Sequence, residues 1–135
     1  MSAEANIATV RRLYEAFGRG DVGTILTGLA EDVDWAADTG SMAAPWYGAR
    51  RGKDEVTAFF SEFGAAMEVE EFTPLAFAGN EDDEVMAIVL CRATSRETGR
   101  SLSMNLHHYF RFRDGKITFY RGTEDTPQTE AALRG

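Results

Sequence analysis

The segment of residues 102–112 limits the possible folds more than any other part of the chain, because apolar and polar residues alternate along its whole length. Such alternation predicts a β-strand with one apolar and one polar face. His108 falls in the apolar row and His107 in the polar row, so the two rings should point to opposite sides of a sheet and not readily chelate one metal ion. The apolar row consists of Leu102, Met104, Leu106, His108, Phe110 and Phe112.

A histidine in an apolar row has two interpretations. It is either a core residue whose ring is satisfied by a hydrogen bond, or a proton-handling group at the bottom of an apolar pocket. In a pocket, the loss of water lowers the pKa of the imidazole and leaves a neutral ring that can accept or donate a proton near neutral pH. The interpretation of His108 therefore decides which function the sequence predicts.

The first half of the chain favours helices. Apolar residues recur at helical intervals over residues 5–17, which predicts a first helix that ends at the glycines that follow. Asp21 is expected to cap a second, short helix whose apolar side extends to Leu29, and Asp54 to cap a third helix. Residues 37–52 hold three glycines and one proline without a clear period, and they predict a long loop over the surface.

The second half of the chain favours strands joined by short turns. Mostly apolar or alternating runs are bounded by turn-forming residues, and Asp114-Gly115 is a typical two-residue hairpin signal. Helices followed by consecutive strands predict an α+β fold in which the helices pack on one face of an antiparallel sheet. The expected strands are 33–36, between the helices, and then 69–77, 85–94, 102–112 and 117–123.

Composition and charge exclude several function classes. The 135 residues suffice for one domain, 1–135, with its own core. A formal net charge of −8 disfavours binding to nucleic acid, anionic membranes and anionic substrates. The single cysteine, Cys91, excludes an internal disulfide and is expected to be a packed apolar side chain. The sequence shows no secretory leader and no membrane-spanning run, so a cytoplasmic protein is expected. It also shows no motif for a metal or a cofactor, so neither is expected.

Five pieces of the sequence occur in an order typical of one superfamily. They are Val10-Arg-Arg-Leu-Tyr14 with Gly20-Asp21, the run from Leu29 to Trp35, Tyr47-Gly48 with Arg51-Gly52, Phe59-Phe60, and the run from His107 to Ile117. With these pieces the chain resembles the nuclear-transport-factor-2-like superfamily and, within it, the SnoaL-like and ketosteroid-isomerase-like proteins. The resemblance implies a strongly curved sheet wrapped with three helices into a cone open at one end. It also implies a homodimer formed through the outer sheet face, with small, mostly apolar organic ligands bound in the cone.

The resemblance also implies roles for individual residues. Tyr14 falls where ketosteroid isomerases have a tyrosine that stabilises an enolate oxygen, and His108 falls where they have a protonated acid. The aspartate that moves the proton in those enzymes corresponds to Ala37, with Asp38 one residue later. This mismatch argues against steroid isomerisation itself.

SnoaL-like cyclases have a catalytic carboxylate near the end of the last strand, and Asp125 is the candidate by position, with Glu124 beside it. Alternation gives these two carboxylates opposite faces if the strand extends so far, and which of them faces the pocket stays open. Trp35 and Trp46 flank the long loop, and they either form cavity walls or pack in the core. The substrate-binding residues expected from the sequence are Phe17, Trp35, Trp46, Phe60, Met104, Phe110 and Tyr120.

Two functions follow from these observations. The leading hypothesis is a cofactor-independent enzyme of the isomerase, cyclase or hydratase and hydrolase type, in which His108 and Tyr14 handle protons or polarise an oxygen and Asp125 or Asp38 supplies the base. The alternative is a non-catalytic dimeric module whose cone holds a small apolar ligand or is filled by its own side chains. Convergence of His108, Tyr14 and a carboxylate on one cavity would favour the enzyme.

Overall fold

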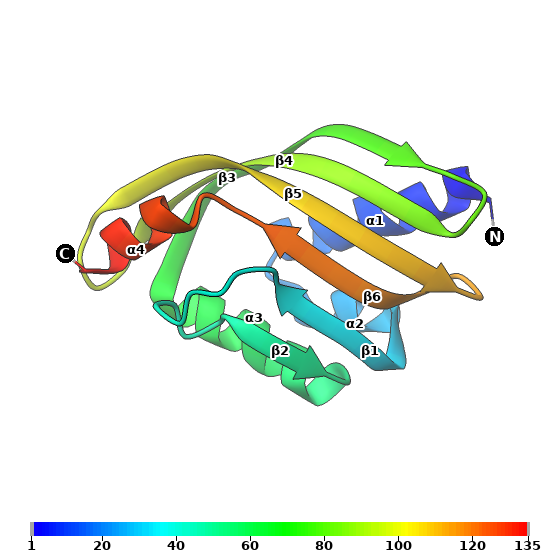
Figure 1. Ribbon diagram of the computed structural model, residues 1–135, viewed down its shortest axis with the longest axis horizontal. Helices are drawn as coiled ribbons and strands as arrows, with labels where there is room; N and C mark the ends of the chain where they lie inside the picture. Colours follow the sequence, from blue (N-terminus) through cyan, green and yellow to red (C-terminus); the bar gives the residue numbers. More distant parts are fainter. Residues whose placement is uncertain (1, 135) are drawn as a thin grey trace.

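The computed structural model of the protein describes residues 2–134, which form four helices and six strands (Figure 1). In α1, Ser2 caps the first turn by accepting a hydrogen bond from the backbone N–H of Ala5, and Val10, Leu13 and Tyr14 form the buried side. The elements are α1 (Ala3–Gly18), α2 (Val22–Thr27), β1 (Leu29–Ala37), β2 (Gly48–Arg51), α3 (Lys53–Ala66), β3 (Met67–Gly79), β4 (Glu84–Ser95), β5 (Ser101–Arg113), β6 (Lys116–Thr123) and α4 (Thr126–Arg134).

The strands form one sheet in the order β2-β1-β6-β5-β4-β3. All neighbouring strands pair antiparallel except β1 and β6, which run parallel. Figure 1 shows the long strands β3 to β6 arching over α1, with α3 lying beneath β1 and β2. The predicted α+β fold with a curved sheet is confirmed. The sheet is not closed, and the parallel pair of β1 and β6 is a feature that the sequence analysis did not predict.

The turn between β5 and β6 is the predicted two-residue hairpin. Asp114 and Gly115 both have positive φ angles, 51° and 79°, which is the backbone of a type I′ turn. This conformation suits glycine and is tolerated by aspartate. The dipeptide pairs Arg113 with Lys116, and a one-residue register shift between Arg111 and Phe112 then brings His108 opposite Gly122. The turn therefore helps to position the centre of β5 against the end of β6.

Several predicted boundaries are wrong. The second helix ends at Thr27, and Leu29 begins β1, which is longer than the expected strand at 33–36. The expected loop at 37–52 contains β2, because its last residues pair with β1. Gly52, with a φ of 85°, stands at the N-cap of α3 in place of Asp54, which lies in the first turn. Helix α4 was not predicted.

The helices cover the concave face of the sheet and leave a partly hollow interior between them. The side chains of Val85, Val89 and Phe110 point from the sheet toward α1 and are fully buried. A second cluster, which contains Met67 and Cys91, fills the end of the sheet near α4. Cys91 is packed as predicted, and burial raises the pKa of its thiol to about 11. Within residues 2–134, no helix has the length and apolar character needed to cross a membrane.

Candidate active site

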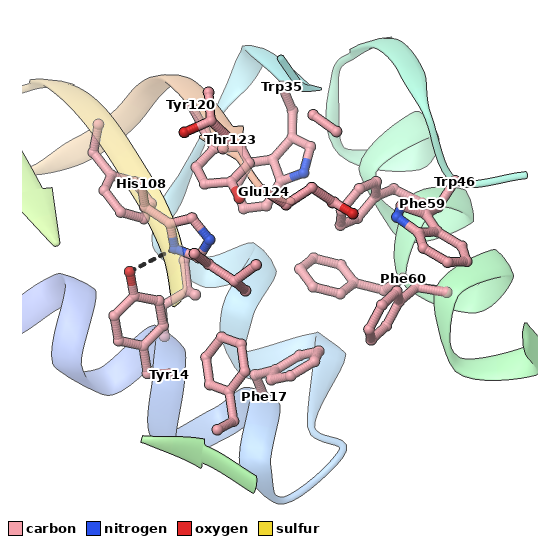
Figure 2. Close-up of a pocket in the computed structure, with 17 residues that line it drawn as sticks. Tyr14, Phe17, Trp35, Trp46, Phe59, Phe60, His108, Tyr120, Thr123 and Glu124 are labelled. Atoms are coloured by element: carbon pink, nitrogen blue, oxygen red, sulfur yellow. Dashed lines mark hydrogen bonds between the residues drawn. The ribbon is translucent and has the colours of Figure 1, made fainter. Parts of the chain in front are cut away.

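A cavity lies between the concave face of the sheet, α1 and α3, and aromatic rings form most of its wall (Figure 2). Its volume is about 80 Å³, counted as the space open to the centre of a water-sized sphere. A single water needs only about 10–15 Å³ by this measure, so the cavity has room for a small ring compound or several waters. The interior is therefore not plugged by its own aromatic side chains.

The cavity contains most of the residues that the sequence analysis expected to bind substrate. The structure places six of these seven side chains on its wall: Phe17, Trp35, Trp46, Phe60, Phe110 and Tyr120. The exception is Met104, which lies on the same face of β5 as Leu106 and His108 but lines an adjoining hollow beside Met67 and Cys91. Phe59 and Phe72 also line the cavity and were not expected there.

Tyr14 and His108 meet inside this cavity although 94 positions separate them in sequence. The Tyr14 hydroxyl and His108 Nδ1 are 2.7 Å apart and hydrogen-bonded. Both side chains are buried, at 4% and 9% exposed, because α1 presses Tyr14 against the inner row of β5. The contact joins the first helix to the strand whose alternation placed His108 on the inner face.

Burial controls the protonation of both groups. Desolvation, with a smaller contribution from the neighbouring charge of His107, lowers the pKa of His108 to about 3, so the imidazole is neutral at neutral pH. Desolvation raises the pKa of Tyr14 above its ordinary value of 10.0, so the phenol keeps its proton. The pair is uncharged and shares one hydrogen bond.

The other ring nitrogen of His108, Nε2, is turned toward the interior of the cavity (Figure 2). If Tyr14 donates to Nδ1, Nε2 carries the proton and is a hydrogen-bond donor to a ligand. If Nδ1 donates to Tyr14, Nε2 offers a lone pair and is a base. The pair can therefore present either a proton or an acceptor to a molecule in the cavity.

Tyr120 fills the space between His108 and Trp35. Its ring stacks on Trp35 with a centroid separation of 4.0 Å and meets His108 edge to face at 5.1 Å. Gly122 makes this arrangement possible, because a Cβ at that position would overlap the Tyr120 hydroxyl and lie 3.1 Å from Cδ2 of His108. The glycine thus lets two aromatic residues of the wall approach the backbone of β6.

A carboxylate, Glu124, reaches the cavity from the segment that follows β6 (Figure 2). The hydroxyl of Tyr47 donates to its Oε2 over 2.9 Å, and the hydroxyl of Thr129 donates to the same oxygen over 2.5 Å. Its Oε1 accepts no hydrogen bond from a side chain or backbone group of residues 2–134. One oxygen therefore fixes the side chain, and the other remains open to a ligand.

The other two candidate carboxylates lie outside the cavity. Asp125 is exposed, directly precedes α4, and accepts a hydrogen bond from the side chain of Gln128. Asp38 is exposed as well, and its backbone N–H donates to the carbonyl of Gly122. The expectation that Asp125 or Asp38 faces the pocket is thus corrected in favour of Glu124. The physical reason is that β6 ends at Thr123, so strand alternation no longer governs which way residues 124 and 125 point.

Tyr47 and Thr129, which hold Glu124, were also missed by the sequence analysis. Tyr47 lies in the segment interpreted as a loop, where no periodicity indicates the direction of a side chain. Thr129 lies in α4, and a signal for this helix was present, because Pro127 follows Thr126 and proline is favoured in the first turn of a helix. A helix predicted from that dipeptide would have brought Thr129 near Glu124.

The described residues offer no evident metal site, since within residues 2–134 no three histidine, cysteine, aspartate or glutamate side chains come together. The described cavity wall also contains no lysine or arginine. The polar groups on this wall include His108 and Glu124, while Tyr14 and Tyr120 hold their protons because burial raises their pKa values.

Solved structures show the same fold. An NTF2-like protein of unknown function from Burkholderia pseudomallei K96243 is 29% identical, with full coverage of both chains and a TM-score of 0.89. TerC, co-crystallised with polyporic acid, is 23% identical over 97% of this chain and 99% of its own, with a TM-score of 0.84. A protein provisionally described as a polyketide cyclase, from Xanthomonas campestris pv. campestris, is 21% identical over 98% and 99% of the two chains, with a TM-score of 0.80. No curated protein matches the sequence.

The sequence also matches a family model. The model describes the SnoaL-like domain, and the match covers residues 10–120, from the middle of α1 to the first part of β6. This span holds Tyr14, Trp35 and His108 but ends before Glu124. Because the match covers most of the chain and the fold agrees with it, the protein belongs to the SnoaL-like family.

Proposed function

We propose that this protein is a cofactor-independent enzyme that moves protons on a small, largely apolar organic molecule by general acid/base catalysis. The observation that carries the proposal is that His108 Nε2 and Glu124 face the same aromatic cavity, each fixed through its other polar atom. Fixed groups of this kind suit proton transfer, because their geometry is set before the ligand binds.

The proposed chemistry needs a substrate already activated by a carbonyl group. Glu124 accepts a proton from the carbon beside the carbonyl, and the electron pair of that C–H bond moves to form an enolate. His108 donates the hydrogen bond from Nε2–H to the enolate oxygen, with Tyr14 as the donor to Nδ1. Return of the proton from Glu124 to another carbon gives isomerisation. Attack of the enolate carbon on a second carbonyl, whose oxygen then takes the proton from Glu124, gives aldol-type cyclisation.

The relatives support this class of reaction without fixing the substrate. Two solved structures with the same fold, from Rhodopseudomonas palustris and Bacillus subtilis, are provisionally described as isomerases, and another as a polyketide cyclase. TerC was co-crystallised with polyporic acid. A small ring compound is what the aromatic wall of this cavity suits.

The experiment that tests the proposal is hydrogen–deuterium exchange. Small ketones that raise the melting temperature of the protein are incubated with it in D₂O, and loss of the proton signal beside the carbonyl is followed by NMR. We expect exchange with the natural sequence and a loss of about 10²-fold or more in the variants His108→Gln and Glu124→Gln. His107→Gln is the matched control, because His107 lies next in sequence but on the outer, exposed face.

The control should exchange at the natural rate, and all three variants should keep the natural circular dichroism spectrum. Unchanged exchange in folded His108→Gln and Glu124→Gln would contradict the proposal.

A non-catalytic binding module is the second candidate. The hydrogen bond between Tyr14 and His108 is also what a satisfied core imidazole would make, and the cavity would then hold a ligand without changing it. A ketone that raises the melting temperature but shows no enzyme-dependent exchange at any pH between 5 and 9 would identify this function.

We also propose that two copies of the chain pair through the outer face of the sheet. On β4 the middle of the row that alternates with the buried residues is apolar: Met86 is 58% exposed, and Ile88 and Leu90 beside it are only partly covered. Leu75 on β3 is 54% exposed. Apolar groups gathered on one face are typical of a protein interface, and sedimentation equilibrium that gives the mass of one chain at micromolar protein would contradict the pairing.

A further inference from the structure

The indole N–H of Trp35 is buried in the cavity wall without a hydrogen-bond partner. Trp35 is 2% exposed, and its Nε1 finds no acceptor among residues 2–134. Figure 2 shows the nitrogen turned toward the interior of the cavity. A buried tryptophan N–H is normally bonded, so the unsatisfied donor needs an explanation.

The surroundings of Trp35 hold its ring in place. One face stacks on Tyr120, at 4.0 Å between centroids and 25° between planes. Phe59 and Phe60 contact the ring at centroid distances of 5.8 and 5.6 Å. The N–H is therefore fixed in direction within an apolar setting and shielded from bulk water, and a molecule bound in the cavity is the natural source of its acceptor.

The charges of the cavity limit what that molecule can be. The wall carries one carboxylate, Glu124, and has no lysine or arginine to balance an anion. An anionic ligand would meet repulsion from Glu124 and from the net charge of −8. An ammonium or guanidinium group would offer no lone pair to Trp35. An uncharged ligand with an acceptor oxygen satisfies both conditions.

We propose that Trp35 Nε1–H is a second donor to the ligand's oxygen and that the ligand is an uncharged ring ketone. One lone pair of its carbonyl accepts the hydrogen bond from Trp35, and the other is left for Nε2–H of His108. The inference rests on the proposed function, because it assigns a substrate class and a binding residue to the same cavity. The carbonyl oxygen lies against Trp35, and the rest of the ring packs between Tyr120 and the phenylalanines of α3.

The test uses two probes of the same shape, 1-indanone and indane, which lacks the oxygen. Trp35 and Trp46 are the only tryptophans of the chain, so ¹⁵N-labelled protein gives two indole N–H signals, and the variant Trp46→Phe identifies them. We expect 1-indanone to move the Trp35 proton downfield relative to the position it takes with indane. The subtraction removes ring-current effects that both probes share.

Affinity provides a second measurement. Trp35→Phe should weaken 1-indanone about tenfold, the size expected for one hydrogen bond, and should leave the affinity for indane within about twofold. If Trp35→Phe does not fold, the two-probe comparison on the natural sequence decides alone. The inference is overturned if both probes move the Trp35 signal equally, or if the substitution weakens both alike. It is also overturned if 1-aminoindane or indane-1-carboxylate binds more tightly than 1-indanone, or if 1-indanone does not bind.

Deuterium exchange at C2 of 1-indanone in the same samples separates this inference from the proposed chemistry. Exchange without a selective shift of the Trp35 proton overturns the role of Trp35 and leaves the acid/base proposal standing. A selective shift without exchange supports the ketone-binding role and contradicts catalysis.

Discussion

Acid should destabilise the protein through His108, and the size of this effect follows from the burial of the ring. Burial holds the pKa of His108 near 3 in the folded protein, and the ordinary value of 6.5 applies to the unfolded chain. Between these two values the unfolded state binds a proton that the folded state does not, so stability falls as the pH drops below 6.5. The loss is complete only when the pH falls below the folded pKa of about 3.

The magnitude can be worked out for a drop from pH 7 to pH 5. Over this range an ordinary histidine goes from about one quarter to almost fully protonated in the unfolded chain, while buried His108 stays neutral, and the linkage relation gives a loss of about 2 kcal/mol. Asp21, Glu62 and Glu84 have lowered pKa values, because hydrogen bonds stabilise their charged forms. Their contribution to the stability of the protein is lost only at more acidic pH. They are also present in every variant, so they cancel in a comparison.

The assay is urea unfolding at pH 7 and pH 5 of the natural sequence and of His108→Gln, which cannot titrate and can still bond Tyr14. The difference in the free energy of unfolding between the two pH values should be about 2 kcal/mol larger in the natural sequence. His107→Gln, at the exposed neighbour, should behave like the natural sequence. Equal pH dependence in the natural sequence and His108→Gln would show that His108 titrates normally and would refute the argument from burial.

Three further perturbations test other parts of the structure. Gly122→Ala should force Tyr120 out of place, lower the free energy of unfolding by about 1–3 kcal/mol and abolish binding of 1-indanone. An unchanged melting temperature would contradict the close approach of Tyr120 to the backbone at Gly122. His108→Phe should cost about 1–3 kcal/mol by leaving the Tyr14 hydroxyl unpaired, and adding Tyr14→Phe should recover most of that loss in urea unfolding, whereas additive losses would count against the pair. Met86→Glu should convert the expected dimer to single chains in sedimentation, and a dimer that persists would place the interface elsewhere.

The inner face of the sheet could be predicted from the sequence because a strand pattern has a fixed period. Alternation over β5 predicted which of two adjacent histidines points inward, and the hairpin dipeptide at 114–115 fixed where β5 ends. The resemblance to SnoaL-like proteins added Tyr14, which lies 94 positions from His108 and is beyond the reach of any local pattern.

The carboxylate could not be predicted in the same way. Glu124 and Asp125 stand between β6 and α4, where neither the period of a strand nor that of a helix applies. Their directions are set by distant hydroxyls, Tyr47 and Thr129, which bind Glu124, and by the start of α4, which takes Asp125 to the surface. The unpaired N–H of Trp35 could not be predicted from the sequence either, because it depends on how β1, α3 and β6 pack around the indole ring.

The hydrogen bond from Thr129 to Glu124 means that the reactivity of the cavity depends on a helix near the end of the chain. Helix α4 is only nine residues long, and it is held to the sheet partly by Gln128, which bonds both backbone groups of Ser103. Fraying there would free the carboxylate from one of its two restraints while the rings around the void stay in place. An affinity tag fused after α4 is therefore a poor choice for kinetic work, and a tag ahead of Ser2 leaves the acid undisturbed.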